Sequence, residues 1–274
     1  VAVLQREVLT LKRELLAFDA EPTASASTPR VASEGGAVVT DEEEKEIRRI
    51  QALIRDSPDL INAITVQIGT GRIGETQLPR YGTPLHKAAQ QGQIQVATFL
   101  LDNGADIEAR DQFGFAALHW AAANGHKSMT ELLLARKANV NGTVESQGSA
   151  DQQGMRYPGS TALLLAVGKG YRTICELLLA RGANPNLPND YSRFPLQEAA
   201  SKNNETLVRL LLEKGADPKA TTPDGYTALH AATSTNVVAL LLKSGADVNA
   251  RNRDGGTALH NAASGNQLAL LELL

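Results

Sequence analysis

The feature that most constrains the fold is a block of four residues that occurs six times and always carries Leu in third place. The blocks begin at Thr83, Ala116, Thr161, Phe194, Thr227 and Thr257, and successive blocks lie 33, 45, 33, 33 and 30 residues apart. The period is therefore 33 residues, with one insertion of 12 residues and one deletion of three. A fixed period of this length indicates a chain built from one repeated unit that stacks on its own neighbours.

Most blocks are followed by the same sequence pattern. An alanine pair such as Ala88 and Ala89 comes first, then a Gly or Asn, the residues that best tolerate a left-handed turn. A leucine run and a Gly-Ala-Asp or Gly-Ala-Asn stop follow, as in residues 177–184. The pattern predicts two short antiparallel helices per unit, and their apolar faces are buried only when several units stack.

In this register the Thr-Pro-Leu-His block, the alanine pair, the leucine run and the Gly-Ala-Asp stop resemble the ankyrin repeat. The resemblance covers residues 81–274. It implies an all-α solenoid of six helix-turn-helix repeats joined by β-hairpin loops, the sixth repeat being incomplete. It also implies that a partner protein binds the concave face formed by the hairpin loops and the first helices, and that the chain is not an enzyme.

Carried over residue by residue, the resemblance places ten candidate partner-binding residues on that face: Lys87, Phe113, Phe115, Trp120, Tyr191, Arg193, Glu198, Tyr226, Arg251 and Arg253. Trp120 is the only tryptophan, and with Phe113, Phe115 and Tyr191 it could form the aromatic anchor typical of interface hot spots. In that case alanine at position 120 would weaken partner binding with little change in stability. The alternative is that Trp120 packs on the neighbouring helix.

Several repeats depart from the pattern. Lys137 stands where other repeats have the helix-ending Gly, and a left-handed Lys costs about 1 kcal/mol relative to Gly. Leu164 and Gln197 replace the His of the block. An insertion at residues 143–157 is polar and predicted to form a loop. The fifth repeat lacks three residues between Ala232 and Val237, which predicts a shorter turn between its helices.

The first 80 residues divide into three predicted segments. Residues 1–18 carry apolar side chains at heptad spacing and resemble the end of a leucine zipper: Val1, Leu4, Val8, Leu11, Leu15 and Phe18. They predict either a homodimeric coiled coil or a lone amphipathic helix. Residues 19–40 are predicted to be a flexible linker. Residues 41–80 are predicted to hold a degenerate leading repeat and a long loop, since Ile47, Ile50, Leu53 and Ile54 lie at helical spacing.

No cofactor or metal site is predicted. Residues 69–74 match the Gly-x-Gly-x-x-Gly fingerprint, but that fingerprint needs a crossover helix, and a helix of the repeat follows instead. A long loop or hairpin is therefore predicted here. Four histidines share the fourth place of the block, where the resemblance implies a structural role, and the repeat separates them along the solenoid: His86, His119, His230 and His260. Cys175 lies beside a leucine run and is predicted to be a core residue.

Composition narrows the class of partner. The net charge of −3 and the aromatic content of 4% disfavour nucleic-acid binding within these residues. A single cysteine favours the cytoplasm or nucleus, and no apolar run is long enough for a membrane span. The chain lacks an initiating Met and stops within an apolar helical pattern, so we expect it to be part of a longer protein.

We therefore expect a protein-interaction scaffold. Two alternatives depend on residues outside this sequence. The chain could belong to a dimeric zipper-type transcription regulator whose basic DNA-binding region precedes Val1, or it could recruit substrate for a larger enzyme.

Overall fold

The structure of the chain is a computed structural model that describes residues 40–63, 66–73, 76–145 and 158–274. The predicted coiled coil of residues 1–18, all but the last residue of the predicted linker, and residues 146–157 of the insertion lie outside the described residues. The zipper-like helix and the homodimer that it predicts therefore stay predictions.

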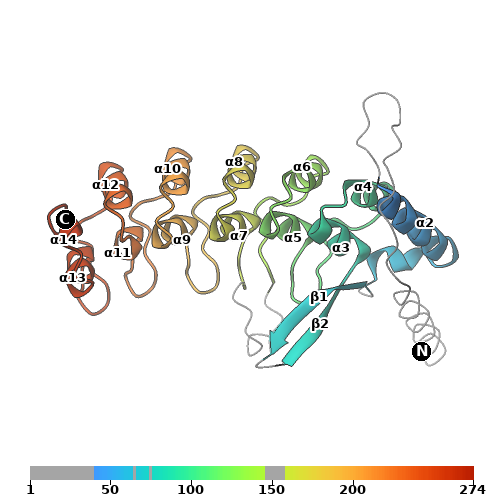
Figure 1. The fold of residues 1–274 in the computed structure, drawn as a ribbon, viewed down its shortest axis with the longest axis horizontal. Helices are drawn as coiled ribbons and strands as arrows, with labels where there is room; N and C mark the ends of the chain where they lie inside the picture. The colour runs from blue at the N-terminus through green and yellow to red at the C-terminus, as the bar shows by residue number, and fades with distance from the viewer. Residues whose placement is uncertain (1–39, 64–65, 74–75, 146–157) are drawn as a thin grey trace.

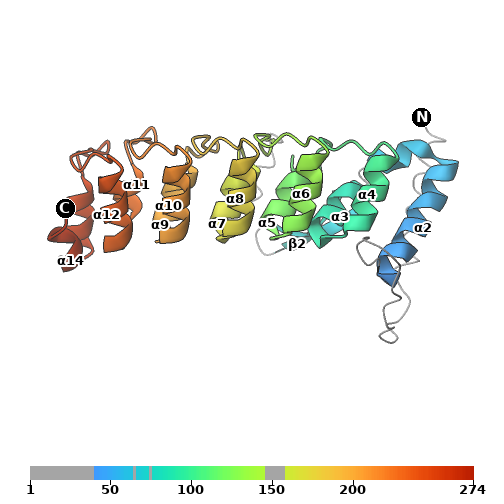
Figure 2. The ribbon, with the colours of Figure 1, turned by 90° about the horizontal axis from the view of Figure 1, so that it is seen from above.

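The repeats form six helix pairs arranged in two rows. Figure 1 shows the first helices in one row and the second helices in the other, with the connecting loops projecting away from the second row. Figure 2 shows the pairs standing side by side along the long axis. The pairs are α3 (Pro84–Gln91) with α4 (Ile94–Asp102), α5 (Ala117–Ala123) with α6 (Lys127–Ala135), α7 (Ala162–Lys169) with α8 (Arg172–Ala180), α9 (Pro195–Ser201) with α10 (Glu205–Glu213), α11 (Ala228–Ala231) with α12 (Thr235–Lys243), and α13 (Ala258–Ser264) with α14 (Leu268–Leu271).

The turns between paired helices use the backbone conformation that the sequence predicts. Gly92 and Gly170 are left-handed, and Asn203 and Asn266 adopt the same region with φ of 50° and 52°. Lys137, at the end of α6, also has a positive φ of 68°. The predicted left-handed lysine is therefore present, and position 137 is one where glycine would be less strained.

The core runs continuously along the solenoid between the two rows. It consists of five of the six third-place leucines, most of the paired alanines and one side of each leucine run, including Leu163, Leu178 and Leu211, which are fully buried. The sixth third-place leucine, Leu259, is exposed. The small alanines let the first helices approach one another closely, so each repeat buries its apolar surface against both neighbours.

The three-residue deletion in the fifth repeat shortens the first helix of that repeat and not only the turn after it. This corrects the prediction of a shorter turn. α11 has four residues, whereas the other first helices have seven or eight. The backbone becomes extended at Ala232, and Asn203 of the preceding turn supports the segment that replaces the missing helical turn. Its Oδ1 accepts hydrogen bonds from the backbone N–H groups of Thr233 and Ser234 at 3.0 and 2.9 Å.

A helix precedes the six pairs, as predicted from its apolar spacing. α2 (Asp41–Asp56) starts with a reciprocal capping box, because Thr40 Oγ1 accepts from the Glu43 N–H and Glu43 Oε2 accepts from the Thr40 N–H, both at 3.2 Å. α2 packs on α4 and so extends the row of second helices, and a 3₁₀ helix, η1 (Pro58–Asn62), follows it. Ile50 and Ile61 join the buried core.

The long segment after η1 forms a β-hairpin, which is one of the two forms predicted from the sequence. β1 (Val66–Ile73) pairs in antiparallel fashion with β2 (Thr76–Gly82), and the glycine-rich residues 69–74 lie mostly within β1. The hairpin contacts α3 and projects in the same direction as the other loops (Figure 1).

Candidate partner-binding face

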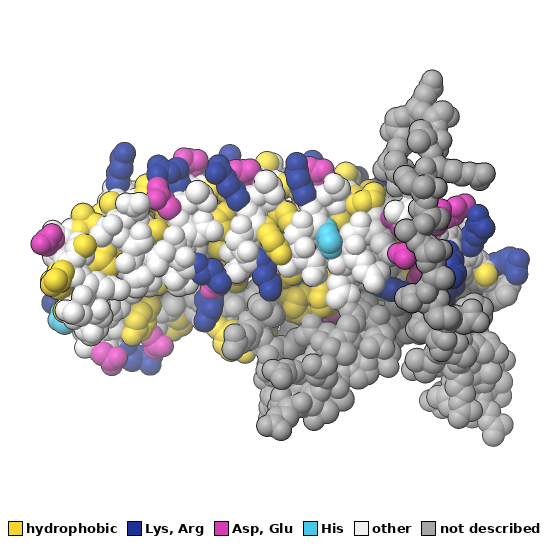
Figure 3. All heavy atoms as spheres, in the orientation of Figure 1, with side chains coloured by type: hydrophobic (Ala, Val, Ile, Leu, Met, Phe, Trp, Pro, Cys, Tyr) yellow, Lys and Arg dark blue, Asp and Glu magenta, His cyan; other side chains and the backbone are white. Residues whose placement is uncertain are grey.

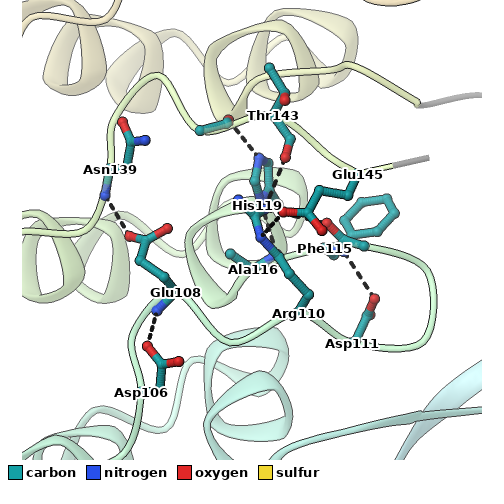
Figure 4. Close-up of polar contacts among 12 residues, drawn as sticks. Asp106, Glu108, Arg110, Asp111, Phe115, Ala116, His119, Asn139, Thr143 and Glu145 are labelled. Carbon is teal, nitrogen blue, oxygen red and sulfur yellow. Dashed lines mark hydrogen bonds and ion pairs between the residues drawn. The ribbon is translucent and has the colours of Figure 1, made fainter. Parts of the chain in front are cut away.

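The first helices and the loops that project from them form one side of the solenoid, here called the inner face. His119 ties two repeats together on this face (Figure 4). Its Nδ1 accepts from the Ala116 N–H at 3.0 Å, and its Nε2 lies 2.9 Å from the carbonyl oxygen of Gly142 in the next loop. Because a carbonyl oxygen can only accept, Nε2 carries the proton and the ring is neutral.

The same arrangement recurs at His86, whose Nε2 lies 2.8 Å from the Phe115 carbonyl oxygen. The Thr83 hydroxyl lies 2.8 Å from His86 Nδ1, so in this repeat Thr binds the His ring. In the third repeat the fourth residue is Leu164, and Thr161 caps the helix by accepting from the Leu164 N–H at 3.2 Å.

These neutral rings make stability depend on pH. Burial lowers the pKa of His119 from 6.5 to about 4, and it also lowers the pKa of His86. Between pH 6.5 and about pH 4, His119 takes up a proton in the unfolded chain but stays neutral in the folded chain. The stabilising contribution is therefore complete above pH 6.5 and is lost as pH falls toward 4, by about 3 kcal/mol in total.

We expect His119→Gln to remove the part of this pH dependence that His119 contributes, while the contribution of His86 remains. Gln197 occupies the same place in the fourth repeat, where its Nε2 donates to the Tyr226 carbonyl oxygen at 2.8 Å and does not titrate. Urea denaturation at pH 7 and pH 5 measures the free energy of unfolding of both proteins. An equal loss of stability in the two proteins on acidification would contradict the assignment.

Buried polar side chains shape the tips of the loops. Asp111 is buried and accepts from the N–H groups of Phe113 at 2.8 Å and Phe115 at 3.0 Å. Asn189 does the same for the N–H groups of Tyr191 and Arg193, at 3.1 and 3.0 Å. The sequence analysis missed these anchors, although an Asp or Asn two residues before the loop tip was a visible signal.

The predicted aromatic anchor is not an exposed cluster, which corrects the sequence prediction. Trp120 is 7% exposed and Phe115 is 3% exposed, and their ring centroids lie 5.2 Å apart. The indole Nε1 donates to Asp111 Oδ2 at 3.0 Å. Phe113 is partly buried against the core, and only Tyr191 is well exposed, at 56%. The structure thus favours the alternative in which Trp120 packs within the solenoid.

Trp120 and Phe115 nevertheless reach the inner face, because they line a cavity of about 470 Å³ across α5, α7 and α9. Ala123, Leu164 and Leu165 contribute further apolar surface. Gly168 leaves the cavity open because it carries no side chain. The equivalent place of the first repeat holds Gln90, whose side chain is much larger. A Cβ added at Gly168 would lie 3.5 Å from Glu198 Oε1, which is an ordinary van der Waals contact.

Charged side chains line the same cavity. Glu198 Oε2 lies 3.1 Å from Arg193 Nη1, and Glu198 Oε1 lies 3.6 Å from Lys202 Nζ. Lys169, in the last turn of α7, is a further cation of the lining. Figure 3 shows Lys and Arg side chains gathered near the middle of the solenoid, below the second-helix row.

The cavity brings together four of the ten predicted residues: Phe115, Trp120, Arg193 and Glu198. The other six lie outside its lining. Lys87 pairs with Glu46 of α2 at 3.4 Å, and Tyr226 packs edge-on against His230 with ring centroids 5.5 Å apart. Arg253 pairs with Asp224 at 2.8 Å, and Arg251 Nη1 donates to the Gly255 carbonyl oxygen.

Among the cavity residues that the sequence analysis missed, three lie in α7 or just after α9: Gly168, Lys169 and Lys202. They occupy the eighth and ninth places of the repeat, whereas only the fifth place was carried over as a first-helix position. One helical turn separates the fifth place from the eighth and ninth, so all three point to the same side of the helix. The helical period was therefore a sufficient signal.

In the part of the chain that the structure describes, no group of three or more His, Cys, Asp or Glu side chains could hold a metal ion. Cys175 is fully buried, and burial raises the pKa of its thiol to about 12. Of the helices described, none combines the length and the apolar character of a membrane span.

The chain belongs to the ankyrin-repeat family. A family model that represents three copies of the ankyrin repeat matches residues 50–144, 85–189, 143–222 and 196–274. Ankyrin repeats form extended surfaces that bind other proteins, so the chain is a protein–protein interaction scaffold.

Curated relatives share shorter stretches of sequence. A putative ankyrin repeat protein of Rickettsia bellii is 53% identical over 53 residues, 19% of this chain and 22% of that protein. The probable E3 ubiquitin-protein ligase XBOS33 of Oryza sativa subsp. japonica is 39% identical over 69 residues, 23% of this chain and 13% of the ligase. Osteoclast-stimulating factor 1 of Danio rerio is 38% identical over 53 residues, 19% of this chain and 25% of that protein. The chain thus spans a quarter or less of the length of each of these relatives.

Proposed function

We propose that the chain holds a partner protein on its inner face and that the contacts centre on the cavity of α5, α7 and α9. The cavity itself is the observation that carries this proposal. Its volume of about 470 Å³ lies within the roughly 300–1,000 Å³ that binding pockets have. Its lining combines apolar side chains with polar and charged ones, and such a combination can fix both the position and the orientation of a ligand.

The rigidity of the surrounding structure supports the same proposal. Asp111 and Asn189 hold two loop tips from beneath, and His119 fastens its own helix to the next loop. A surface that is already ordered loses little conformational entropy when a partner binds. The inner face around the cavity is therefore suited to binding with little rearrangement.

The proposal is tested by affinity capture from a cell extract followed by mass spectrometry. The wild-type chain is compared with Gly168→Gln, which fills the cavity. Gly168 lies inside helix α7, where glutamine is more favourable than glycine by roughly 0.5–1 kcal/mol, so this variant should fold. Ala239→Gln, at an exposed position of the second-row helix α12, is the matched control.

We expect a partner that the wild type and Ala239→Gln both retain and that Gly168→Gln loses. Retention by all three proteins would place the partner site elsewhere and contradict the proposal. Thermal denaturation of each variant shows that a loss of capture does not follow from unfolding.

A second candidate function rests on the names of the relatives. Two of them are a probable E3 ubiquitin-protein ligase of Oryza sativa and the integrin-linked protein kinase homolog pat-4 of Caenorhabditis elegans, of which the chain covers 13% and 11%. In a larger enzyme of this kind the repeats would recruit the substrate. The protein that wild type captures and Gly168→Gln loses would then be that substrate.

A further inference from the structure

We infer that the cavity takes an apolar side chain from an extended segment of the partner whose flanking residues are acidic. This inference rests on the proposed function and adds the chemistry of the partner. The floor of the cavity, the charge of its rim and its extent across three repeats support it.

The floor of the cavity matches an apolar side chain. Trp120, Leu164 and Leu165 line it, and Gly168 contributes no side chain that would fill it. The lining also holds Asn124, Ser160 and Asn189. The indole N–H donates to Asp111, and the Asn124 and Asn189 amides donate to the Trp120 carbonyl oxygen and to Ser160 Oγ, so these donors are already engaged within the chain. Burying an apolar side chain here gains about 25 cal/mol for each Å² removed from water, whereas a polar side chain would lose its hydrogen bonds to water.

The rim of the cavity favours negative charge. It holds the three cations Lys169, Arg193 and Lys202 and the single carboxylate of Glu198. Glu198 is already paired with Arg193 and Lys202, so the rim keeps an excess of positive charge. The chain as a whole has a net charge of −3, and the rim is therefore a local reversal of sign. Such a reversal attracts and orients an acidic partner.

The extent of the cavity favours an extended segment. Its lining comes from α5, α7 and α9, the first helices of three successive repeats, and from the loops beside them. A segment that crosses this row can place one side chain in the cavity and its neighbours beside the rim. A single-stranded nucleic acid fits less well, because the chain has a net charge of −3 and aromatic residues make up only 4% of it.

A selection from a library of random peptides tests the inference. The wild-type chain is the bait, and the selected peptides are made synthetically and titrated against four variants. Gly168→Gln blocks the cavity, while Lys169→Glu and Lys202→Glu reverse charges on its rim. Lys243→Glu is the matched control, because Lys243 lies in the last turn of its helix, as Lys169 does, but in the second row.

We expect the selected peptides to combine an apolar residue with flanking Asp or Glu. Their affinity should fall about tenfold or more with Gly168→Gln and with each rim reversal, and stay unchanged with Lys243→Glu. Peptides that need an open cavity but show no acidic preference would overturn the inference and leave the proposed function standing. Peptides that are indifferent to Gly168→Gln would overturn both. Tighter binding of a single-stranded oligonucleotide that is lost with Gly168→Gln would also overturn the inference.

Discussion

Replacing Trp120 with alanine should lower the free energy of unfolding by about 3–5 kcal/mol. The indole is buried against Phe115, and its removal leaves a void between α5 and the loop before it. It also removes a hydrogen bond to Asp111, because the indole Nε1 donates to the buried Asp111 carboxylate beside the two backbone N–H donors. Both effects act in the same direction, so this is one of the two largest changes that we expect from a single substitution.

Urea denaturation followed by far-UV circular dichroism measures this loss. Tyr191→Ala is the matched control, because Tyr191 is an aromatic residue of the inner face that is 56% exposed. Its removal should change stability by no more than about 0.5 kcal/mol. If Trp120→Ala is as stable as Tyr191→Ala, the indole is not part of the core as the structure places it.

Leu178→Ala should destabilise the chain by about 2–5 kcal/mol. Leu178 is fully buried in α8, in the middle of the solenoid. The backbone of a helix packed on both sides cannot collapse into the space that the side chain leaves, so a cavity remains. The midpoint of urea denaturation reports the effect, with Thr173→Ala on the exposed side of the same helix as the control. Equal midpoints for the two variants would show that Leu178 does not carry the core of its repeat.

The solenoid was predicted well from the sequence because the same residue pattern recurs in each repeat. The third-place leucines and the leucine runs are fixed by the helical period, and the left-handed Asn203 and Lys137 were identified from their place in the repeat. The short helix α11 was predicted less well, since a deletion between Ala232 and Val237 could be absorbed by the turn or by the helix. The side chain of Asn203 decides in favour of the helix, and that contact lies between repeats.

The candidate site was only partly predictable, because it depends on what neighbouring repeats leave empty. Trp120 was recognised as unusual, but its exposure depends on Phe115 and Asp111, which enclose it from the preceding loop. Gly168 carries no side chain to attract notice, and yet its missing side chain opens the cavity. The cavity forms only where three repeats pack side by side, so the sequence of a single repeat does not reveal it.

If the inner face binds a partner through the cavity, then filling the cavity must weaken that binding. The most direct test is the dissociation constant of the captured partner for the wild type, for Gly168→Gln and for Ala239→Gln, measured by calorimetry. A hot-spot cavity predicts a loss of about 2 kcal/mol or more for Gly168→Gln, roughly a thirtyfold weaker complex, and no change for Ala239→Gln. Equal dissociation constants for all three folded proteins would contradict it.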